Sequence, residues 1–371
     1  MSVCEDEDSA YEYFKHNFNY NPNDCCNLRG VCMTTDSFDV NKKEILYDTL
    51  SKLPKNKIII DNFIKAFWII NNDVYKKIIC TVSGGADSDV MMDICIKCDV
   101  DKKIDYVWID TGLEYQATKD HLKYLEEKYG VDIIRYRAIK SIPLSCKQYG
   151  QPFLSKQVSE FIQRLQRHNF KFEDKSFEEL YEEYPKCKSA LQWWCNRNIS
   201  YSLNISGHKW LKEFLVANPP TFNISNKCCK YAKKDVAHKT ISENQYDLNI
   251  YGVRKSEGGA RAQAYKNCFD QNDDSFDNYR PLFYYKGADR VEYELAFDIV
   301  HSKCYTEYGL DRTGCAGCPF GRNFEFELSI IENFEPKLFK AANKIFKDSY
   351  AYTREYKEFR KKMDKKVKNN K

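Results

Sequence analysis

The segment Lys77–Cys98, KIICTVSGGADSDVMMDICIKC, constrains the fold of this chain most, because it predicts a strand, a glycine turn and a helix in direct succession. The apolar run Ile78–Val82 is typical of a buried parallel strand. Two glycines interrupt it, and apolar residues then recur at helical spacing between Val90 and Cys98. We therefore expect a strand whose turn lies at the start of a helix.

The turn SGGADS has the composition of an anion site, and its candidate ligand-binding residues are Ser83, Gly84, Gly85, Asp87 and Ser88. Glycine lets the backbone approach a ligand, and the N–H groups and positive dipole end at a helix start favour an anion. We expect phosphate, pyrophosphate or sulfate here. A purely structural glycine turn is the alternative.

Further strands and helices alternate after this unit. Strands are predicted at 104–109, 131–136 and 247–251, and helices at 57–72 and 118–129. Such alternation predicts an α/β fold with a doubly wound, mainly parallel sheet, whose ligands bind beyond the carboxyl ends of the strands. Asp110, Thr111 and Gly112 end the strand at 104–109, so we add them to the site. A carboxylate there can reach a ribose hydroxyl or, through Mg²⁺, a phosphate; a helix cap is its alternative role.

The chain of 371 residues suffices for one large α/β domain with additions or for two domains. We expect an N-terminal extension (1–45), a first part of the core (46–140), a helical insert (141–226), a completion of the core (227–322) and a helical basic tail (323–371). The insert carries Arg, Lys and Trp residues that can stack bases, but its composition favours a packed helical lid.

Composition restricts the class of protein. Hydrophobic residues make up 43% and no apolar run approaches the roughly 20 residues that span a bilayer, so we expect no membrane partner. The start MSVCEDEDSAYEYF lacks a secretory signal, which makes the cytoplasm the expected location. A net charge of +4 does not by itself indicate nucleic acid, which stays a possible partner.

Sixteen cysteines are read as thiols, some of them bound to metal. Cys228 and Cys229 are adjacent, whereas Cys315 and Cys318 form a CxxC turn between glycines. Adjacent cysteines strain the two spaced pairs of a zinc site, while an iron–sulfur cubane offers a separate iron to each sulfur. A 4Fe-4S cluster is therefore favoured over zinc or no metal. Three further cysteines, Cys25, Cys26 and Cys32, are read as free thiols, with a second metal site as the alternative.

A second glycine-rich loop, GVRKSEGGAR, follows the strand at 247–251. Its cations Arg254, Lys255 and Arg261 suit a multiply charged phosphate or sulfate, because guanidinium binds oxyanions through two parallel hydrogen bonds. A solvated surface patch is the alternative.

These motifs together resemble one superfamily. SGGADS resembles the PP-loop, SGGxDS, of ATP pyrophosphatases and phosphoadenosine phosphosulfate (PAPS) reductases, and DTGLEYQAT resembles the DTGxx[FY]xxT segment of the reductases. GVRKSEGGAR resembles their anion loop, with Ser256 and Glu257 in swapped order. The cysteine pattern, with Lys233 after the pair, resembles that of 4Fe-4S adenosine phosphosulfate (APS) reductases. The resemblance implies an adenine nucleotide alpha hydrolase-like fold.

The resemblance also implies an enzyme that binds APS, PAPS or ATP for sulfur chemistry. Reduction of a phosphosulfate to sulfite, with a thiol or other electron donor, is the first reaction it implies. Adenylation with release of pyrophosphate, followed by sulfur transfer to a nucleic acid or a small acceptor, is the second. A nucleotide-sensing protein without turnover is the third.

One feature departs from the reductases, which attack sulfur with a cysteine in a C-terminal ECGxH-type motif. No cysteine follows Cys318 in this chain. The remaining candidates for an accessible, low-pKa nucleophile are Cys146, Cys195, Cys268 and Cys304.

Overall fold

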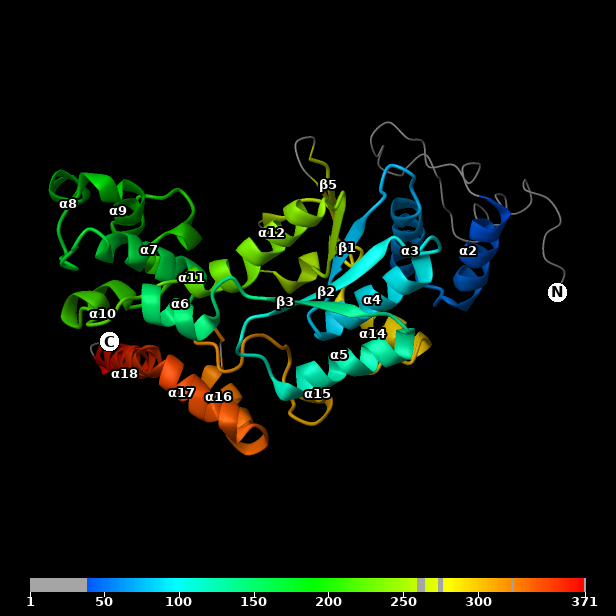
Figure 1. Ribbon diagram of the computed structural model, residues 1–371. Helices are drawn as coiled ribbons and strands as arrows, with labels where there is room; N and C mark the ends of the chain where they lie inside the picture. Colours follow the sequence, from blue (N-terminus) through cyan, green and yellow to red (C-terminus); the bar gives the residue numbers. More distant parts are fainter. Residues whose placement is uncertain (1–38, 259–263, 273–275, 322, 370–371) are drawn as a thin grey trace. The chain divides into compact units, whose positions relative to one another are not determined.

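The computed structural model describes residues 39–258, 264–272, 276–321 and 323–369 (Figure 1). Two compact units share them: unit 1 contains the described residues within 39–108, 117–136 and 238–312, and unit 2 those within 109–116, 137–237 and 313–369. The expected sites at Cys25, Cys26, Cys32 and Arg261 lie outside the described residues.

Unit 1 is built on a six-stranded sheet with the order β3-β2-β1-β4-β6-β5. The strands are β1 (Ile78–Thr81), β2 (Ile104–Asp110), β3 (Ile133–Arg137), β4 (Leu248–Tyr251), β5 (Phe269–Asp270) and β6 (Asp277–Tyr279). β1 pairs in parallel with β2 and β4, β4 pairs in parallel with β6, and β5 is antiparallel to β6 at the edge. The predicted α/β, mainly parallel sheet is confirmed.

Helices lie on both faces of this sheet. They are α2 (Val40–Lys52), α3 (Lys57–Ile70), α4 (Ala86–Cys98), α5 (Gln116–Tyr129), α12 (Asp235–Asn244), α14 (Gly287–Ala296) and α15 (Lys303–Thr306) (Figure 1). Side chains alternate along a strand, so Ile78 shares a core with α3, α4 and α5, whereas Ile79 packs with Ile241 of α12. The sheet is therefore doubly wound, as expected.

Unit 2 is helical. Its helices are α6 (Ile142–Tyr149), α7 (Lys156–Gln166), α8 (Phe177–Glu183), α9 (Lys188–Trp194), α10 (Leu211–Ala217), α11 (Lys227–Cys229), α16 (Phe324–Phe334), α17 (Pro336–Ile345) and α18 (Lys347–Asn369). Trp193 and Trp194 of α9 are completely buried in one core with Phe214 of α10 and Tyr352 of α18. These tryptophans therefore stabilise a packed core and are not exposed for base stacking.

Helix ends in the C-terminal segment follow from local sequence. Glu335 ends α16 and caps α17, and Pro336 is the first residue of α17, where its missing N–H costs no hydrogen bond. Within the described ranges, none of the helices combines the length and the apolar character needed to cross a membrane.

Candidate functional site

The SGGADS turn joins β1 to α4, as predicted. Gly84 adopts the left-handed conformation with φ of 66°, and a Cβ there would lie 2.8 Å from Thr118 Cγ2, so only glycine fits. The Ser83 N–H donates to Ser88 Oγ at 2.8 Å, which closes the turn. Ser83 is exposed and Asp87 half-buried, so solvent reaches the start of α4. The backbone N–H groups at that helix start suit an anion.

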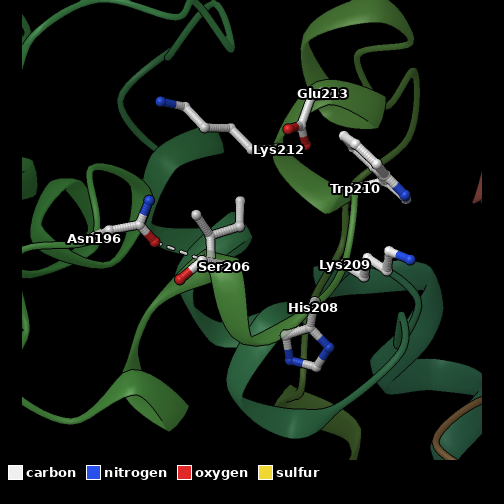
Figure 2. Close-up of a pocket in the computed structure, with 8 residues that line it drawn as sticks. Asn196, Ser206, His208, Lys209, Trp210, Lys212 and Glu213 are labelled. Atoms are coloured by element: carbon white, nitrogen blue, oxygen red, sulfur yellow. Dashed lines mark hydrogen bonds between the residues drawn. The ribbon is translucent and has the colours of Figure 1, made fainter. Parts of the chain in front are cut away.

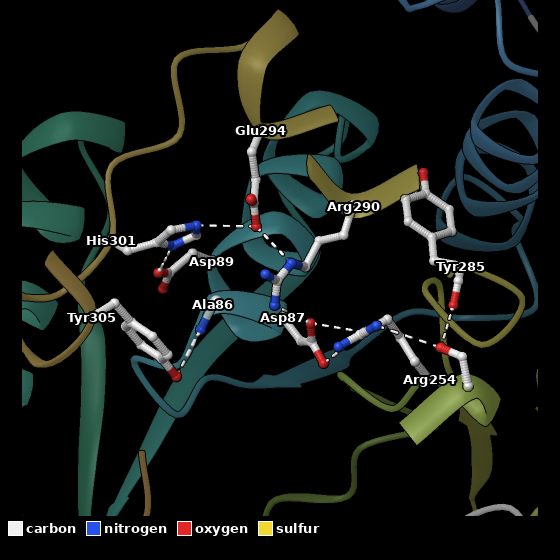
Figure 3. A network of polar contacts seen from close by, with 10 residues as sticks. Ala86, Asp87, Asp89, Arg254, Tyr285, Arg290, Glu294, His301 and Tyr305 are labelled. Atoms are coloured by element: carbon white, nitrogen blue, oxygen red, sulfur yellow. Dashed lines mark hydrogen bonds and ion pairs between the residues drawn. The ribbon is translucent and has the colours of Figure 1, made fainter. Parts of the chain in front are cut away.

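Two arginines bind the carboxylate of this turn (Figure 3). Arg254 Nε lies 2.9 Å from both Asp87 oxygens, and Arg290 Nη1 lies 3.2 Å from Oδ1. Arg254 Nη1 also donates to Ser256 Oγ at 3.4 Å. Arg254 was predicted for the site, whereas Arg290, on α14, was not. Asp87 thereby holds both guanidinium groups beside the SGGADS turn.

Lys255, the other cation predicted in this loop, lies in the short 3₁₀ turn η7 (Lys255–Glu257) and its side chain is exposed. Its backbone N–H donates to the Phe283 carbonyl at 2.9 Å.

A buried charge network lies on the first turn of α4. Asp89 is fully buried, and its Oδ2 lies 2.8 Å from His301 Nδ1 and 3.0 Å from His121 Nε2. His301 Nε2 lies 3.0 Å from Glu294 Oε1, which in turn lies 2.8 Å from Arg290 Nε (Figure 3). The network therefore connects α4 to α5, α14 and the segment before α15.

Tyr305 of α15 contacts the turn itself. Its hydroxyl oxygen accepts a hydrogen bond from the Ala86 N–H at 3.2 Å (Figure 3). Ala86 is the first residue of α4, so this phenol lies where an anion bound by the helix start would be.

The His301 network predicts a pH-dependent stability. Burial alone would lower the pKa of His301, but hydrogen bonds to Asp89 and Glu294 outweigh it and raise the pKa to about 9. Because this folded-state pKa lies above the unfolded value of about 6.5, the stabilisation is complete below about pH 6.5 and disappears as pH rises through about 9. We expect His301→Gln to lower the free energy of unfolding by about 1–3 kcal/mol more at pH 6 than above pH 9, measured by chemical denaturation. The half-buried His168 replaced by Gln serves as the control for loss of an imidazole, and equal losses of His301→Gln at both pH values would contradict the assignment.

The DTG segment belongs to unit 2, where it forms its own turn. The Gly112 N–H donates to Asp110 Oδ1 at 2.9 Å, and Thr111 Oγ1 donates to Glu114 Oε1 at 2.5 Å. Thr111 Oγ1 also lies 3.7 Å from Cys315 Sγ. The segment therefore contacts the CxxC turn that sequence analysis assigned to a metal.

The CxxC turn is held in place by its backbone. The Ala316 N–H donates to the Leu113 carbonyl at 2.9 Å, and the Tyr350 hydroxyl donates to the Gly317 carbonyl. Gly317 has φ of 63°, and a Cβ there would lie 2.7 Å from the Tyr350 hydroxyl. Both anchors orient the thiols of Cys315 and Cys318.

The four predicted metal-binding thiols interact in unit 2. A hydrogen bond to Cys228, followed by burial, raises the pKa of Cys229. Burial, then the charges of Cys315 and Cys229, raises the pKa of Cys318. Directly after Cys229 the chain makes a π-helical turn, η6 (Lys230–Lys234), a rare element that is frequent at functional sites.

Lys233, in this turn, is the cation of the cysteine cluster. The charge of Cys315, above all, raises the pKa of Lys233, and burial opposes this effect. Conversely, burial raises the pKa of Cys315 and Lys233 lowers it. Lys233 therefore offsets part of the repulsion between neighbouring thiolates.

The four thiols are the residues that would hold a 4Fe-4S cluster. Among the described residues, no three His, Cys, Asp or Glu side chains are arranged to hold a single metal ion. A zinc site needs all sulfurs about 2.3 Å from one point, whereas a cubane binds each sulfur to a separate iron. The 4Fe-4S cluster at these four thiols therefore stays a prediction.

A match to a family model identifies the family of this chain. The model described as the phosphoadenosine phosphosulfate reductase domain matches residues 77–171 and 166–320, which is more than half of the chain. The chain belongs to this family. The match extends over both the PP-loop and the four cysteines.

A relative in this comparison is an uncharacterised protein from Methanocaldococcus jannaschii, which is 25% identical over 317 residues. The aligned region covers 82% of this chain and 50% of the relative. This chain thus spans about half the length of the curated relative it matches.

The solved structures that match are more distant in sequence. The PAPS reductase of Candida auris in a phosphate complex is 13% identical, with 85% of this chain and 97% of that chain covered and a TM-score of 0.35. The U34-tRNA thiolase NcsA of Methanococcus maripaludis with its [4Fe-4S] cluster is 12% identical, with coverages of 82% and 80% and a TM-score of 0.35. An FMN adenylyltransferase of Candida glabrata is also 12% identical, with coverages of 75% and 71% and a TM-score of 0.35. No functional conclusion follows at this level of similarity.

Three of the four candidate nucleophiles of a family reductase are buried, and the fourth is half-buried. Cys304 and Cys268 are buried in unit 1, and Cys304 Sγ lies 3.7 Å from Thr118 Oγ1. Cys146 is buried beside Cys228, with which it shares a hydrogen bond, and burial raises the pKa of the half-buried Cys195. A thiol nucleophile needs access and a low pKa, so its identity stays a prediction.

A cavity of about 310 Å³ in unit 2 is lined by other residues (Figure 2). They are Asn196, Ile205, Ser206, His208, Lys209, Trp210, Lys212 and Glu213. None of these belongs to the predicted site.

Sequence reasoning missed three parts of the site. Arg290 lies 203 residues from Asp87, and only its helical spacing to Glu294 marked it as a member of an ion pair. His121 gave no signal in the sequence, and Cys146, a candidate nucleophile, was not expected beside Cys228. Each acquires its role through a partner far away in the chain.

Proposed function

We propose that this chain binds an adenine nucleotide through its PP-loop and uses it to adenylate a substrate for sulfur transfer. The arrangement of Asp87 between Arg254 and Arg290 at the start of α4 is the observation that supports this proposal most. It concentrates two guanidinium groups and the helix N–H groups beside one glycine turn, which suits a multiply charged phosphate.

In this reaction a nucleophile of the substrate attacks the α-phosphorus of ATP. The bond between the α-phosphorus and the bridging oxygen breaks, and pyrophosphate leaves into the SGGADS turn. A sulfur donor, such as a thiol or sulfide, then displaces AMP from the adenylated substrate. Mg²⁺ would accompany ATP, with Asp110 as its candidate ligand.

The residues proposed to hold a 4Fe-4S cluster are Cys228, Cys229, Cys315 and Cys318, with Lys233 beside them. When bound, a cluster supplies a redox-active, sulfur-rich centre. Lys233 would balance its negative charge, and the Tyr350 contact would keep the CxxC turn in position.

Reduction of APS or PAPS to sulfite is the second candidate, favoured by the family model. It requires a thiolate that attacks the sulfuryl sulfur. The burial of Cys146, Cys268 and Cys304 is the reason we rank this reaction second, with a thiol from a partner as the remaining source.

A product assay separates these reactions. Anaerobically purified protein is incubated with ATP, APS or PAPS, and pyrophosphate, AMP, adenosine bisphosphate and sulfite are measured. We expect pyrophosphate and AMP from ATP in the presence of the acceptor and sulfide. Release of sulfite from APS or PAPS without pyrophosphate would contradict adenylation and support reduction. Tight nucleotide binding with no product would indicate a nucleotide sensor.

A further inference from the structure

Lysines surround the cysteine cluster of unit 2. The stretches 140–149 and 227–234 carry Cys146, Cys228 and Cys229, and neither contains an Asp or a Glu. Together they contribute Lys140, Lys147, Lys227, Lys230, Lys233 and Lys234, which we call the lysine face. The helices of the two stretches, α6 and α11, pack against each other, and Lys140 of the first stretch lies over the Tyr231 ring of the second.

Two tyrosines form the centre of the lysine face. The rings of Tyr149 and Tyr231 stack with centroids 5.0 Å apart. The Lys140 ammonium lies 4.8 Å from the first ring centroid and 5.0 Å from the second, and it donates a hydrogen bond to the Tyr149 hydroxyl. Lys227 and Lys230 lie 5.9 and 5.3 Å from the Tyr231 centroid. Three ammonium groups thus gather around one ring.

Few carboxylates compensate these charges. Lys230 pairs with Asp235 at 2.6 Å, and Glu114 acts on Lys233. In the ranges that the structure describes, no ion pair is formed by Lys140, Lys147, Lys227 or Lys234. Like charges held this close repel one another, and the tyrosine rings offset only part of that repulsion. A ligand with several regularly spaced negative charges would relieve the remaining repulsion between these lysines.

We propose that the lysine face binds single-stranded nucleic acid, with backbone phosphates on the lysines and a base stacked against the Tyr149–Tyr231 pair. Positive charge combined with partly exposed aromatic rings is the arrangement that binds single strands without sequence preference. An acidic protein would use the charge but not the rings. Because Cys146 and Cys228 lie in the same packed helices, the bound strand lies beside the cysteine cluster.

That the bound strand is also the sulfur acceptor rests on the function proposed above. Binding of the strand to the lysine face does not depend on that function. Binding requires only residues of unit 2, and the PP-loop with Arg254 and Arg290 belongs to unit 1. The two proposals can therefore be tested separately on the same full chain.

The test measures fluorescence anisotropy of labelled single-stranded RNA and DNA of about 15 nucleotides, within the range of known site sizes, against salt concentration. The double variant Lys140→Gln, Lys227→Gln removes two charges of the lysine face. We expect the slope of log affinity against log salt to fall by about 1.4, since each lost phosphate contact removes about 0.7. Tyr231→Leu should weaken binding about fivefold to 100-fold with an unchanged slope.

A matched control removes two charges elsewhere in unit 2, by Lys171→Gln and Lys186→Gln, and should leave affinity and slope unchanged. Circular dichroism checks that each variant is folded. Equal effects of the two double variants would overturn the proposal. So would displacement of the oligonucleotide by poly-glutamate of the same charge at equal concentration, because that result indicates an acidic protein partner. A difference in affinity between RNA and DNA identifies which nucleic acid the lysine face prefers. Preference for either one supports the proposal.

ATP binding, measured in the same variants, separates the two proposals. Loss of oligonucleotide binding with normal ATP binding is the result expected here. A wild-type chain that binds the oligonucleotide but not ATP would contradict the proposed function and leave this inference standing.

Discussion

Replacing Cys315 with serine is expected to abolish the brown colour and most of the bound iron of anaerobically purified protein. Cys315 is one of four thiols gathered in unit 2, and its charge interacts with Lys233 and Cys229. Loss of one thiolate leaves an iron without its protein sulfur, and structural metal binding is coupled to folding. We therefore also expect a lower melting temperature. Iron and acid-labile sulfide are measured together with the visible spectrum.

Cys187→Ser is the matched control, because Cys187 is a buried thiol of the aromatic core of unit 2 and is not one of the four predicted ligands. It should retain iron and colour. A colourless wild-type preparation with stoichiometric zinc and no iron would refute the cluster assignment. Retention of full iron by Cys315→Ser would remove Cys315 from the ligand set.

Replacing Arg254 with alanine is expected to weaken ATP binding about tenfold to 100-fold. Its guanidinium lies against Asp87 through Nε, which leaves the planar group oriented beside the loop. A hydrogen bond to a charged group contributes about 1.5–3 kcal/mol, which corresponds to that loss. Isothermal titration with a non-hydrolysable ATP analogue measures the change.

Arg254→Lys should recover only part of the affinity, because an ammonium keeps the charge but not the planar fork. Arg167→Ala, an exposed arginine of unit 2, serves as the control for loss of one positive charge. Unchanged affinity in a folded Arg254→Ala protein would show that Arg254 only braces Asp87. A parallel measurement on Arg290→Ala tests the arginine that sequence reasoning missed.

Much of unit 1 could be predicted because its signals are local. The run Ile78–Val82, the glycines of the turn and the helical spacing after Asp87 each depend on neighbouring residues. The predicted strands at 104–109 and 247–251 appear as β2 and β4, and both pair with β1 in parallel. The short strands β5 and β6 were missed, since two or three residues give no readable alternation.

The insert shows how composition alone leaves alternatives open. Arg, Lys and Trp in 141–226 suited both a packed core and a base-stacking surface. The structure buries Trp193 and Trp194, whereas Tyr149 and Tyr231 remain partly exposed among lysines. Burial is decided by which helices pack together, and no single segment encodes that.

The sequence by itself determined the βα unit with its glycine turn, the parallel sheet and the two cysteine pairs, because backbone preferences and short spacings act within a few residues. Only the tertiary structure decided that Arg290 joins Arg254 on Asp87, that His121 and His301 share Asp89, and that Cys146 lies beside Cys228. Charges, imidazoles and thiols interact over a few ångströms in space. The chain brings such groups together from positions as far as 212 residues apart, and only the packing of the fold decides which of them are in contact.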